Sequence, residues 1–190
     1  MATTHPQRHH EMPTSGRALT GVAVSATLHC LTGCALGEIT GMIIATAAGW
    51  PNSSSIAISV VLAFVFGYTL TSLPLLRAGL PVAAVVRIAL ASDTISIAIM
   101  ELTDNAILLV IPDALNAGLD TLLFWGSLGF SLVIAGAFAV PANRWLIARG
   151  KGHVAVHETG VHGGPPVRLV AAVAAISFVF GAAVLVGEAV

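Results

Sequence analysis

Long apolar stretches alternate with short polar ones along the chain. A run of about 20 predominantly apolar residues is long enough to cross the hydrocarbon core of a bilayer as a helix. Runs of this kind occupy residues 19–48, 56–77, 82–111, 121–147 and 167–187. The segments between them contain Gly, Pro, Asn or Asp, as turns do. The pattern predicts an all-α fold, an integral membrane helical bundle with five transmembrane helices.

The N-terminal segment differs from the rest of the chain. Residues 1–17 are polar and lack apolar periodicity, so we expect a disordered cytoplasmic leader before one transmembrane domain at residues 18–190. The first apolar run is too long, and carries too many polar side chains, for a cleaved signal peptide. We therefore expect it to be retained as a helix that begins after Thr14 or Ser15.

Composition supports a membrane protein and excludes some classes of function. Hydrophobic residues make up 56% of the chain, charged residues only 9%, and the mean hydropathy is +0.93. The net charge is −1, and this balance argues against nucleic-acid binding. The sequence contains no phosphate-binding loop, dinucleotide fingerprint, CxxCH haem attachment or HExxH motif. It leaves open whether the protein is an enzyme, and a non-enzyme is favoured.

The positions of the basic residues predict the orientation. Cytoplasmic loops collect Lys and Arg, and aromatic belts mark the two interfaces. With the N-terminus in the cytoplasm, Trp50 and Trp125 lie at the outer interface and Trp145 at the inner one. All basic residues then fall on or near the cytoplasmic face: Arg8, Arg17, Arg77, Arg87, Arg144, Arg149, Lys151 and Arg168. We therefore predict a cytoplasmic N-terminus and an outside C-terminus.

Acidic residues occur inside two predicted spans, where they are costly. Glu38 lies in the first span, and Asp93, Glu101 and Asp104 lie in the third. An Asp at the centre of a membrane helix costs about 2.5 to 3.5 kcal/mol, so such residues usually face the bundle interior and mark a binding site or pathway.

Helical spacing indicates that these acids share a face with other polar groups. Cys30, Cys34 and Glu38 follow one another at intervals of four residues, which places them in one row. Gly33, Gly37 and Gly41 form the neighbouring row, whose GxxxG spacing allows another helix to approach closely. The first and third spans run in the same direction. Their polar faces lie at similar depths and are expected to meet.

Thiol, imidazole and carboxyl groups together favour a transition metal over calcium or magnesium. We therefore expect a transition-metal ion (copper, zinc or iron) to bind between the first and third helices. The protein is also a candidate for transport of that ion. The candidate ligands are Cys30, Cys34, Glu38, Glu101, Asp93, Asp104 and His29, the last as a ligand or a supporting group. His-rich tracts bind metals loosely, and a second hint comes from His5, His9, His10, His153, His157 and His162.

Each candidate also has an ordinary structural interpretation. The cysteines can be small packing residues, and His29 a hydrogen-bonded core histidine. Asp93 can pair with Arg87, while Glu38 and Glu101 can be protonated carboxyls hydrogen-bonded between helices. A disulfide between two cysteines at i and i+4 would require the helix to deform.

Other classes of function stay open at this point. A membrane redox protein would use the thiols with a quinone, or a haem ligated by His29. A non-catalytic subunit or a proton-conducting bundle would need only the carboxyls or the glycines. Because five spans are few for an alternating-access machine, we also expect assembly into a homo-oligomer in the lipid bilayer.

Three motifs resemble one family. They are HCLTGCALGE at residues 29–38, MELTDN at 100–105 and PANRWLIARGKGH at 141–153. In these motifs the chain resembles the domain of unknown function 4396, a bacterial family of multi-pass membrane proteins, over most of residues 20–153. The resemblance implies a helical membrane fold in the bacterial inner (plasma) membrane.

Overall fold

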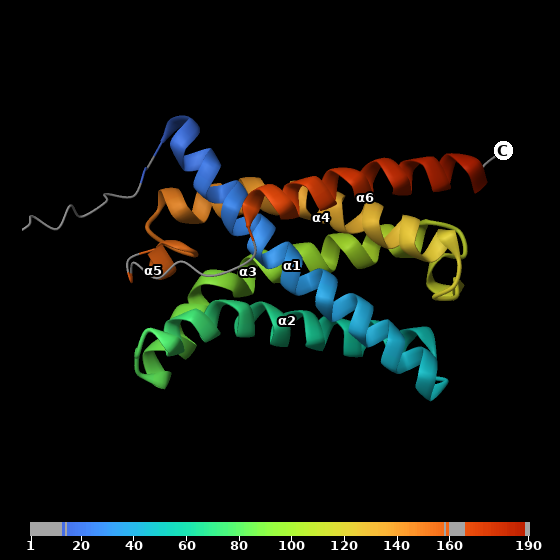
Figure 1. The fold of residues 1–190 in the computed structure, drawn as a ribbon, viewed down its shortest axis with the longest axis horizontal. Helices are drawn as coiled ribbons and strands as arrows, with labels where there is room; N and C mark the ends of the chain where they lie inside the picture. The colour runs from blue at the N-terminus through green and yellow to red at the C-terminus, as the bar shows by residue number, and fades with distance from the viewer. Residues whose placement is uncertain (1–12, 14, 158, 160–165, 189–190) are drawn as a thin grey trace, which may run out of the picture.

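A computed structural model describes residue 13, residues 15–157, residue 159 and residues 166–188. This part of the chain is helical and contains no strand (Figure 1). Its elements in chain order are α1 (Gly16–Ala48), α2 (Asn52–Arg77), α3 (Val82–Val110), the 3-10 turn η1 (Ala114–Asn116), α4 (Leu122–Ala148), the short α5 (Val154–His157) and α6 (Val167–Glu188). The leader expected at residues 1–17 lies mostly outside the described residues, as do His5, His9, His10 and His162.

Five of these helices, α1, α2, α3, α4 and α6, are long and apolar enough to cross a membrane, which confirms the predicted number of spans. The helix α1 begins at Gly16, directly after Ser15 as expected, although the Ser15 side chain makes no capping hydrogen bond. The helix α2 begins at Asn52, four residues before its predicted start. Pro51, just before the helix, has an extended backbone conformation, and polar Asn and Ser residues occupy the first turn. The backbone N–H groups of that turn have no partner within the helix.

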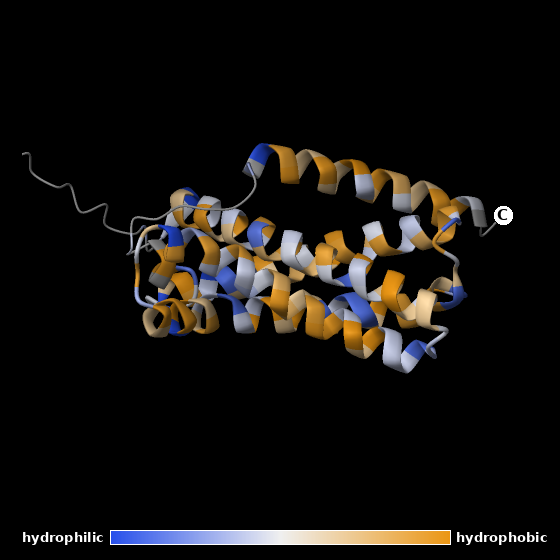
Figure 2. Ribbon diagram, turned by 60° about the horizontal axis from the view of Figure 1, so that its bottom comes forward, coloured by the Kyte–Doolittle hydropathy of each residue, from blue (hydrophilic) through white to orange (hydrophobic). Residues whose placement is uncertain are grey.

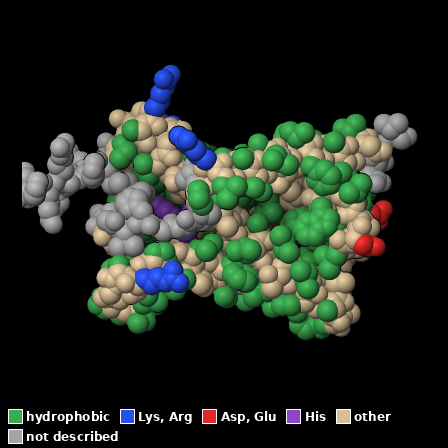
Figure 3. Space-filling model, in the orientation of Figure 1, with side chains coloured by type: hydrophobic (Ala, Val, Ile, Leu, Met, Phe, Trp, Pro, Cys, Tyr) green, Lys and Arg blue, Asp and Glu red, His purple; other side chains and the backbone are tan. Residues whose placement is uncertain are grey.

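The chain passes back and forth between two chemically different ends. The end where α5 lies carries the basic residues of the described chain, and we call it the basic end (Figures 1 and 3). The opposite, acidic end carries Asp113 and Asp120 in the α3–α4 connection. At the basic end Arg149 stacks 4.1 Å from the ring centre of the exposed Trp145, as expected of an interface anchor. Which end faces the cytoplasm stays a prediction.

The side chains are distributed as lipid requires. Large apolar residues point outward, with Leu102 76% and Val110 81% exposed. Serine, threonine, asparagine and acidic side chains are buried between α1, α2, α3 and α4 instead, and hydrophilic positions are visible inside the bundle in Figure 2. The mostly apolar α6 lies on the outside, against α4, where Phe130 and Phe178 stack with ring centres 5.4 Å apart. The polar interior is therefore built by the first four spans.

The glycine row of α1 forms a close contact with α2, which confirms its predicted packing role. A side chain at Gly33 would collide with the backbone of Gly67, one at Gly37 with the backbone of Ala63, and one at Gly41 with Ser59. Small residues on both helices let their backbones approach, and this packing replaces the hydrophobic effect that lipid cannot supply.

This contact gives a stability prediction. The substitution Gly37→Leu should lower the free energy of unfolding by about 2 kcal/mol or more, because the new side chain meets the α2 backbone, which cannot move aside. Gly21→Leu is the matched control on the same helix, since Gly21 is exposed and has open space around it. Thermal or denaturant unfolding in detergent measures both variants. Equal stability of the two would contradict the close α1–α2 contact.

Candidate metal centre

The polar faces of α1 and α3 meet inside the bundle. The Cys30 thiol donates to Asp93 Oδ1 at 3.9 Å, a long sulfur contact, and farther along Cys34 Sγ lies 3.8 Å from Met100 Sδ. Beyond these, the Asn105 side-chain amide donates to Glu38 Oε1 at 3.4 Å. The arrangement expected from the residue spacing is therefore present over two helical turns of α1.

Three potential metal ligands converge near the basic end. One ligand atom each from Cys30, Asp93 and His153 lies within 4.8 Å of the other two, and all three residues are buried. The His153 Nδ1–Asp93 Oδ1 distance is 3.5 Å and the Cys30 Sγ–Asp93 Oδ1 distance is 3.9 Å. Ligand atoms around a tetrahedral zinc ion are about 3.3 to 3.6 Å apart, from the usual metal–ligand bond lengths. Small side-chain movements would bring this trio to that geometry.

His153 reaches this position through a tight turn after α4. Gly150 and Gly152 have φ values of +68° and +66°, which favour glycine, and they reverse the chain within a few residues. The Lys151 N–H donates to the Leu146 carbonyl at 2.9 Å, which closes the turn. Val154 then packs into a small apolar cluster with residues of α1 and α4 and holds the segment in place.

The sequence predicts for His153 only a place among loosely metal-binding histidines. The GKGH run was the available signal, because two glycines around one residue indicate a sharp change of chain direction that can return a side chain to the bundle. The turn geometry itself, which decides where the imidazole points, is not encoded in any periodicity.

His29 stands beside the three ligands, outside their group. Its Nε2 forms a hydrogen bond with Thr71 Oγ1 of α2 at 3.0 Å. Its ring meets the His153 ring edge-on, with centres 5.6 Å apart. Thr71 in turn lies next to the Asp93 carboxyl. His29 is therefore placed to support the centre, and it would have to turn to become a fourth ligand.

The Asp93 side chain lies in the interior of the bundle. It is fully buried, and the Ser92 hydroxyl donates to its Oδ1 at 2.7 Å. Within the described residues its Oδ2 makes no hydrogen bond. The contacts with Cys30 and His153 replace the pairing with Arg87 that the sequence allowed, because the side chain turns toward α1 instead of back along its own helix.

A buried asparagine fastens three helices next to the centre. The Asn143 amide of α4 donates to Thr27 Oγ1 of α1 at 2.8 Å and to Ser96 Oγ of α3 at 3.0 Å. Thr27 lies three residues before Cys30, and Ser96 lies three residues after Asp93. This junction therefore fixes the spacing of the helices that carry two of the ligands.

The other predicted ligands form a second group farther from the basic end. Cys34, Glu38, Glu101 and Asp104 are all buried there. Glu101 lies beside Cys34 and Glu38, and Asp104 lies near Glu38 and Ser131 of α4. Asp93 and Glu101 are eight residues apart on α3, or about 12 Å along its axis, which is too far for one ion. The seven residues predicted as one set thus divide between two places.

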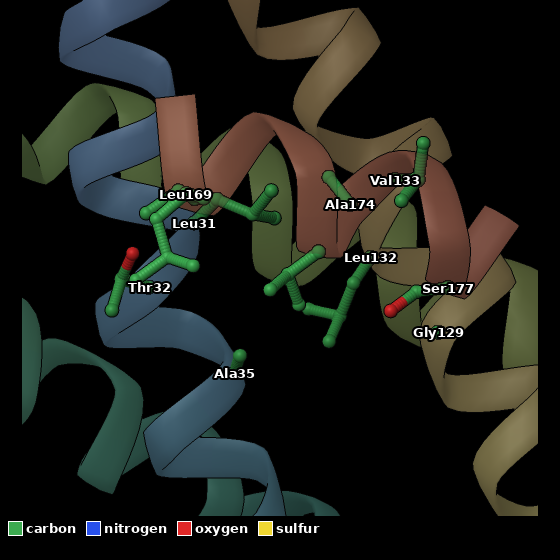
Figure 4. Close-up of a pocket in the computed structure, with 11 residues that line it drawn as sticks. Leu31, Thr32, Ala35, Gly129, Leu132, Val133, Leu169, Ala174 and Ser177 are labelled. Atoms are coloured by element: carbon green, nitrogen blue, oxygen red, sulfur yellow. The ribbon is translucent and has the colours of Figure 1, made fainter. Parts of the chain in front are cut away.

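A separate apolar cavity of about 300 Å³ lies between α1, α4 and α6 (Figure 4). Leucine, valine and alanine side chains dominate its lining, with Thr32 and Ser177 as the hydroxyl-bearing residues. None of the described residues that line it is ionisable, so it offers no ligand for a cation.

Comparison with known proteins identifies a family. Residues 21–152 match the family model described as Domain of unknown function (DUF4396), so the chain belongs to this family. The match includes Cys30, Asp93 and the glycine turn, and it ends one residue before His153. No curated protein and no solved structure matches the chain.

The asparagine junction can be tested by its effect on stability. Asn143→Ala should lower the free energy of unfolding by about 1 kcal/mol, because it removes two buried interhelical hydrogen bonds. Asn52→Ala is the control, since Asn52 makes only an exposed side-chain hydrogen bond to Asn116. Unfolding curves in detergent compare the two, and the same loss in both variants would contradict a special role for the junction.

Proposed function

We propose that this member of the DUF4396 family binds a transition-metal cation within the membrane, at a centre formed by Cys30, Asp93 and His153. The observation that carries the proposal is the convergence of these three ligand atoms within 4.8 Å from α1, α3 and the turn before α5. Such a mixture of thiol, carboxyl and imidazole suits zinc best, and copper and iron share parts of this preference.

Charge supports a divalent ion at this position. With a thiolate, a carboxylate and a neutral imidazole, the ligands carry two negative charges. A divalent cation brings the centre to zero net charge, which lowers the cost of placing it in an apolar bundle. Asp93 Oδ2, which makes no hydrogen bond in the described part of the chain, would gain a nearby cation.

The number of ligands favours an exchangeable ion. Structural zinc sites are usually closed by four protein ligands, whereas three protein ligands leave one position for water or another group. The half-buried His29 borders that position and could guide or complete the ligation. Histidine side-chain atoms are also visible at the surface near the basic end in Figure 3.

Transport of the metal across the membrane stays a prediction. The centre lies toward the basic end of the bundle, and the carboxyl groups of Glu38, Glu101 and Asp104 lie farther along the same helices, toward the acidic end. The cytoplasmic orientation, the bacterial inner membrane and a homo-oligomer likewise stay predictions.

A redox function has less support. Cys30 and Cys34 are both free thiols, and each contacts a partner on α3. Neither thiol forms a disulfide, and the Nε2 atom of His29, which a haem would need, is hydrogen-bonded with Thr71. These contacts favour metal ligation over thiol exchange.

Metal titration of the purified protein tests the proposal. The metal-stripped protein in detergent should bind one equivalent of Zn²⁺, and one of Co²⁺ with the absorption of a cobalt–thiolate bond. Cys30→Ser and Asp93→Asn should weaken binding by more than the roughly 10- to 100-fold typical of residues that only support ligands. Cys34→Ser, one turn away on the same helix and equally buried, is the matched control and should bind normally. Absence of binding in the wild type, or equal loss in both cysteine variants, would refute this centre.

The glycine turn provides an independent test of the role of His153. Gly152→Ala forces a residue with a side chain into a left-handed conformation, at a cost of about 1 kcal/mol, and pushes against Leu146. We expect weaker Zn²⁺ binding because the turn that carries His153 shifts. Gly79→Ala imposes the same backbone strain in the α2–α3 turn, where there is open space, and should leave Zn²⁺ affinity unchanged. Unchanged affinity in both variants would exclude His153 as a ligand positioned by this turn.

A further inference from the structure

We propose that Glu38, Glu101 and Asp104, which we call the carboxyl trio, form a proton-binding site inside the bundle that is distinct from the metal centre. The trio binds protons whether or not a metal ion is present, so this inference does not rest on the proposed function. The inference assigns a ligand, the proton, to the buried acidic residues of α1 and α3 that lie outside the metal centre.

Two members of the trio, Glu101 and Asp104, have carboxyl oxygens without hydrogen-bond partners among the described residues. Glu38, Glu101 and Asp104 are 2%, 4% and 0% exposed. Among the described residues, neither oxygen of Glu101 and neither oxygen of Asp104 has a hydrogen-bond partner of ordinary geometry, although Cys34 and Glu38 lie beside Glu101. Buried polar atoms are nearly always hydrogen-bonded. Four such atoms in one place therefore indicate a ligand that satisfies them.

Among the described residues, the helices packed around the trio supply no positive charge to it. The titratable side chains of α2 are Tyr68 and Arg77, and that of α4 is Arg144. Tyr68 bonds Thr94 on α3, and the two arginines belong to the basic end, at the other end of their helices. The groups that face the trio from α2 and α4 are the hydroxyls of Ser59 and Ser131. Its titratable neighbour on α1 is the Cys34 thiol.

Three carboxylates without a cation would repel one another in a medium that screens charge poorly. Protons or a metal ion must therefore neutralise them, and geometry favours protons. Within the described chain, the carboxyl oxygens do not form a set of three within 4.8 Å, as Cys30, Asp93 and His153 do. Glu38 lies beside Glu101 and near Asp104, and Glu101 also lies near Asp104.

A pair of carboxyl groups is suited to hold one proton. The acid O–H of one group donates to the carboxylate oxygen of the other, and transfer of that proton exchanges the two roles without any change of oxidation state. Glu38, on α1, lies near both Glu101 and Asp104 of α3. The Asn105 amide donates to Glu38 Oε1 at 3.4 Å and to the Glu101 backbone carbonyl at 2.9 Å, which holds Glu38 against α3. A proton can therefore be shared between Glu38 and Glu101, whose carboxyl groups lie beside one another.

Infrared spectroscopy of the reconstituted protein tests this site. At neutral pH the wild type should show the carbonyl absorption of protonated carboxyl groups, with a shift in D₂O that demonstrates an exchangeable proton. Glu38→Gln, Glu101→Gln and Asp104→Asn should each remove part of that absorption. Asp113→Asn is the matched control at the acidic end and should leave it unchanged. Absence of the band in the wild type, or a band unaffected by all three substitutions, would overturn the proposal.

Zn²⁺ titration of the same variants separates this inference from the metal centre. Glu101→Gln should bind Zn²⁺ as the wild type does, and Cys30→Ser should keep the infrared band while it loses Zn²⁺. Failure of Zn²⁺ binding in the wild type would refute the metal centre and leave the trio standing. Loss of Zn²⁺ binding in Glu101→Gln, with the overall fold retained by circular dichroism, would show that the trio ligates the metal and would overturn the proton site.

Discussion

The contact between the polar faces of α1 and α3 is the constraint on which the rest of the structure depends. Lipid offers no hydrogen bonds, so acids and thiols on a spanning helix must find partners inside the protein. Cys30, Cys34 and Glu38 all do so on α3. The other helices hold this contact together: α2 packs against the glycine row of α1, and α4 inserts Asn143 beside it. Burial of the acidic and thiol side chains therefore depends on the tight packing of the helices.

Much of this arrangement could be predicted from the sequence because it depends on helical periodicity. The five apolar runs predict the spans, and intervals of four residues predict that Cys30, Cys34 and Glu38 share a face. The GxxxG row likewise predicts a close helix neighbour, and the structure identifies it as α2. Periodicity succeeds here because each feature depends on only one helix.

The parts that could not be predicted depend on several elements at once. His153 joins the centre because two left-handed glycines fold the chain back after α4, and turn direction leaves only a faint trace in sequence. The division of the candidate ligands follows from depth: residues eight apart on α3 share a face and still lie about 12 Å apart. The sequence indicates which residues share a helix face. Which of them lie together in one site also depends on the crossing of α1 over α3, which Figure 1 shows.

The two polar groups differ in the chemistry they can support. The one near the basic end combines sulfur, nitrogen and oxygen donor atoms that lie within 4.8 Å of one another. The other, nearer the acidic end, offers mainly carboxyl oxygens, and the arginines of the facing helices lie at the opposite end. A cation centre followed by a proton-binding group along the same helix pair is an arrangement in which metal and proton occupancy can be coupled, since metal binding to thiols and carboxyls releases protons.

X-ray absorption spectroscopy of the zinc-loaded protein tests the central claim most directly, because it counts the ligand atoms around the ion. A centre built from Cys30, Asp93 and His153 predicts a single sulfur neighbour at about 2.3 Å, with nitrogen and oxygen neighbours at about 2.0 to 2.2 Å. Two sulfur neighbours would mean that Cys34 joins Cys30 on the metal. A shell without sulfur would contradict the centre altogether.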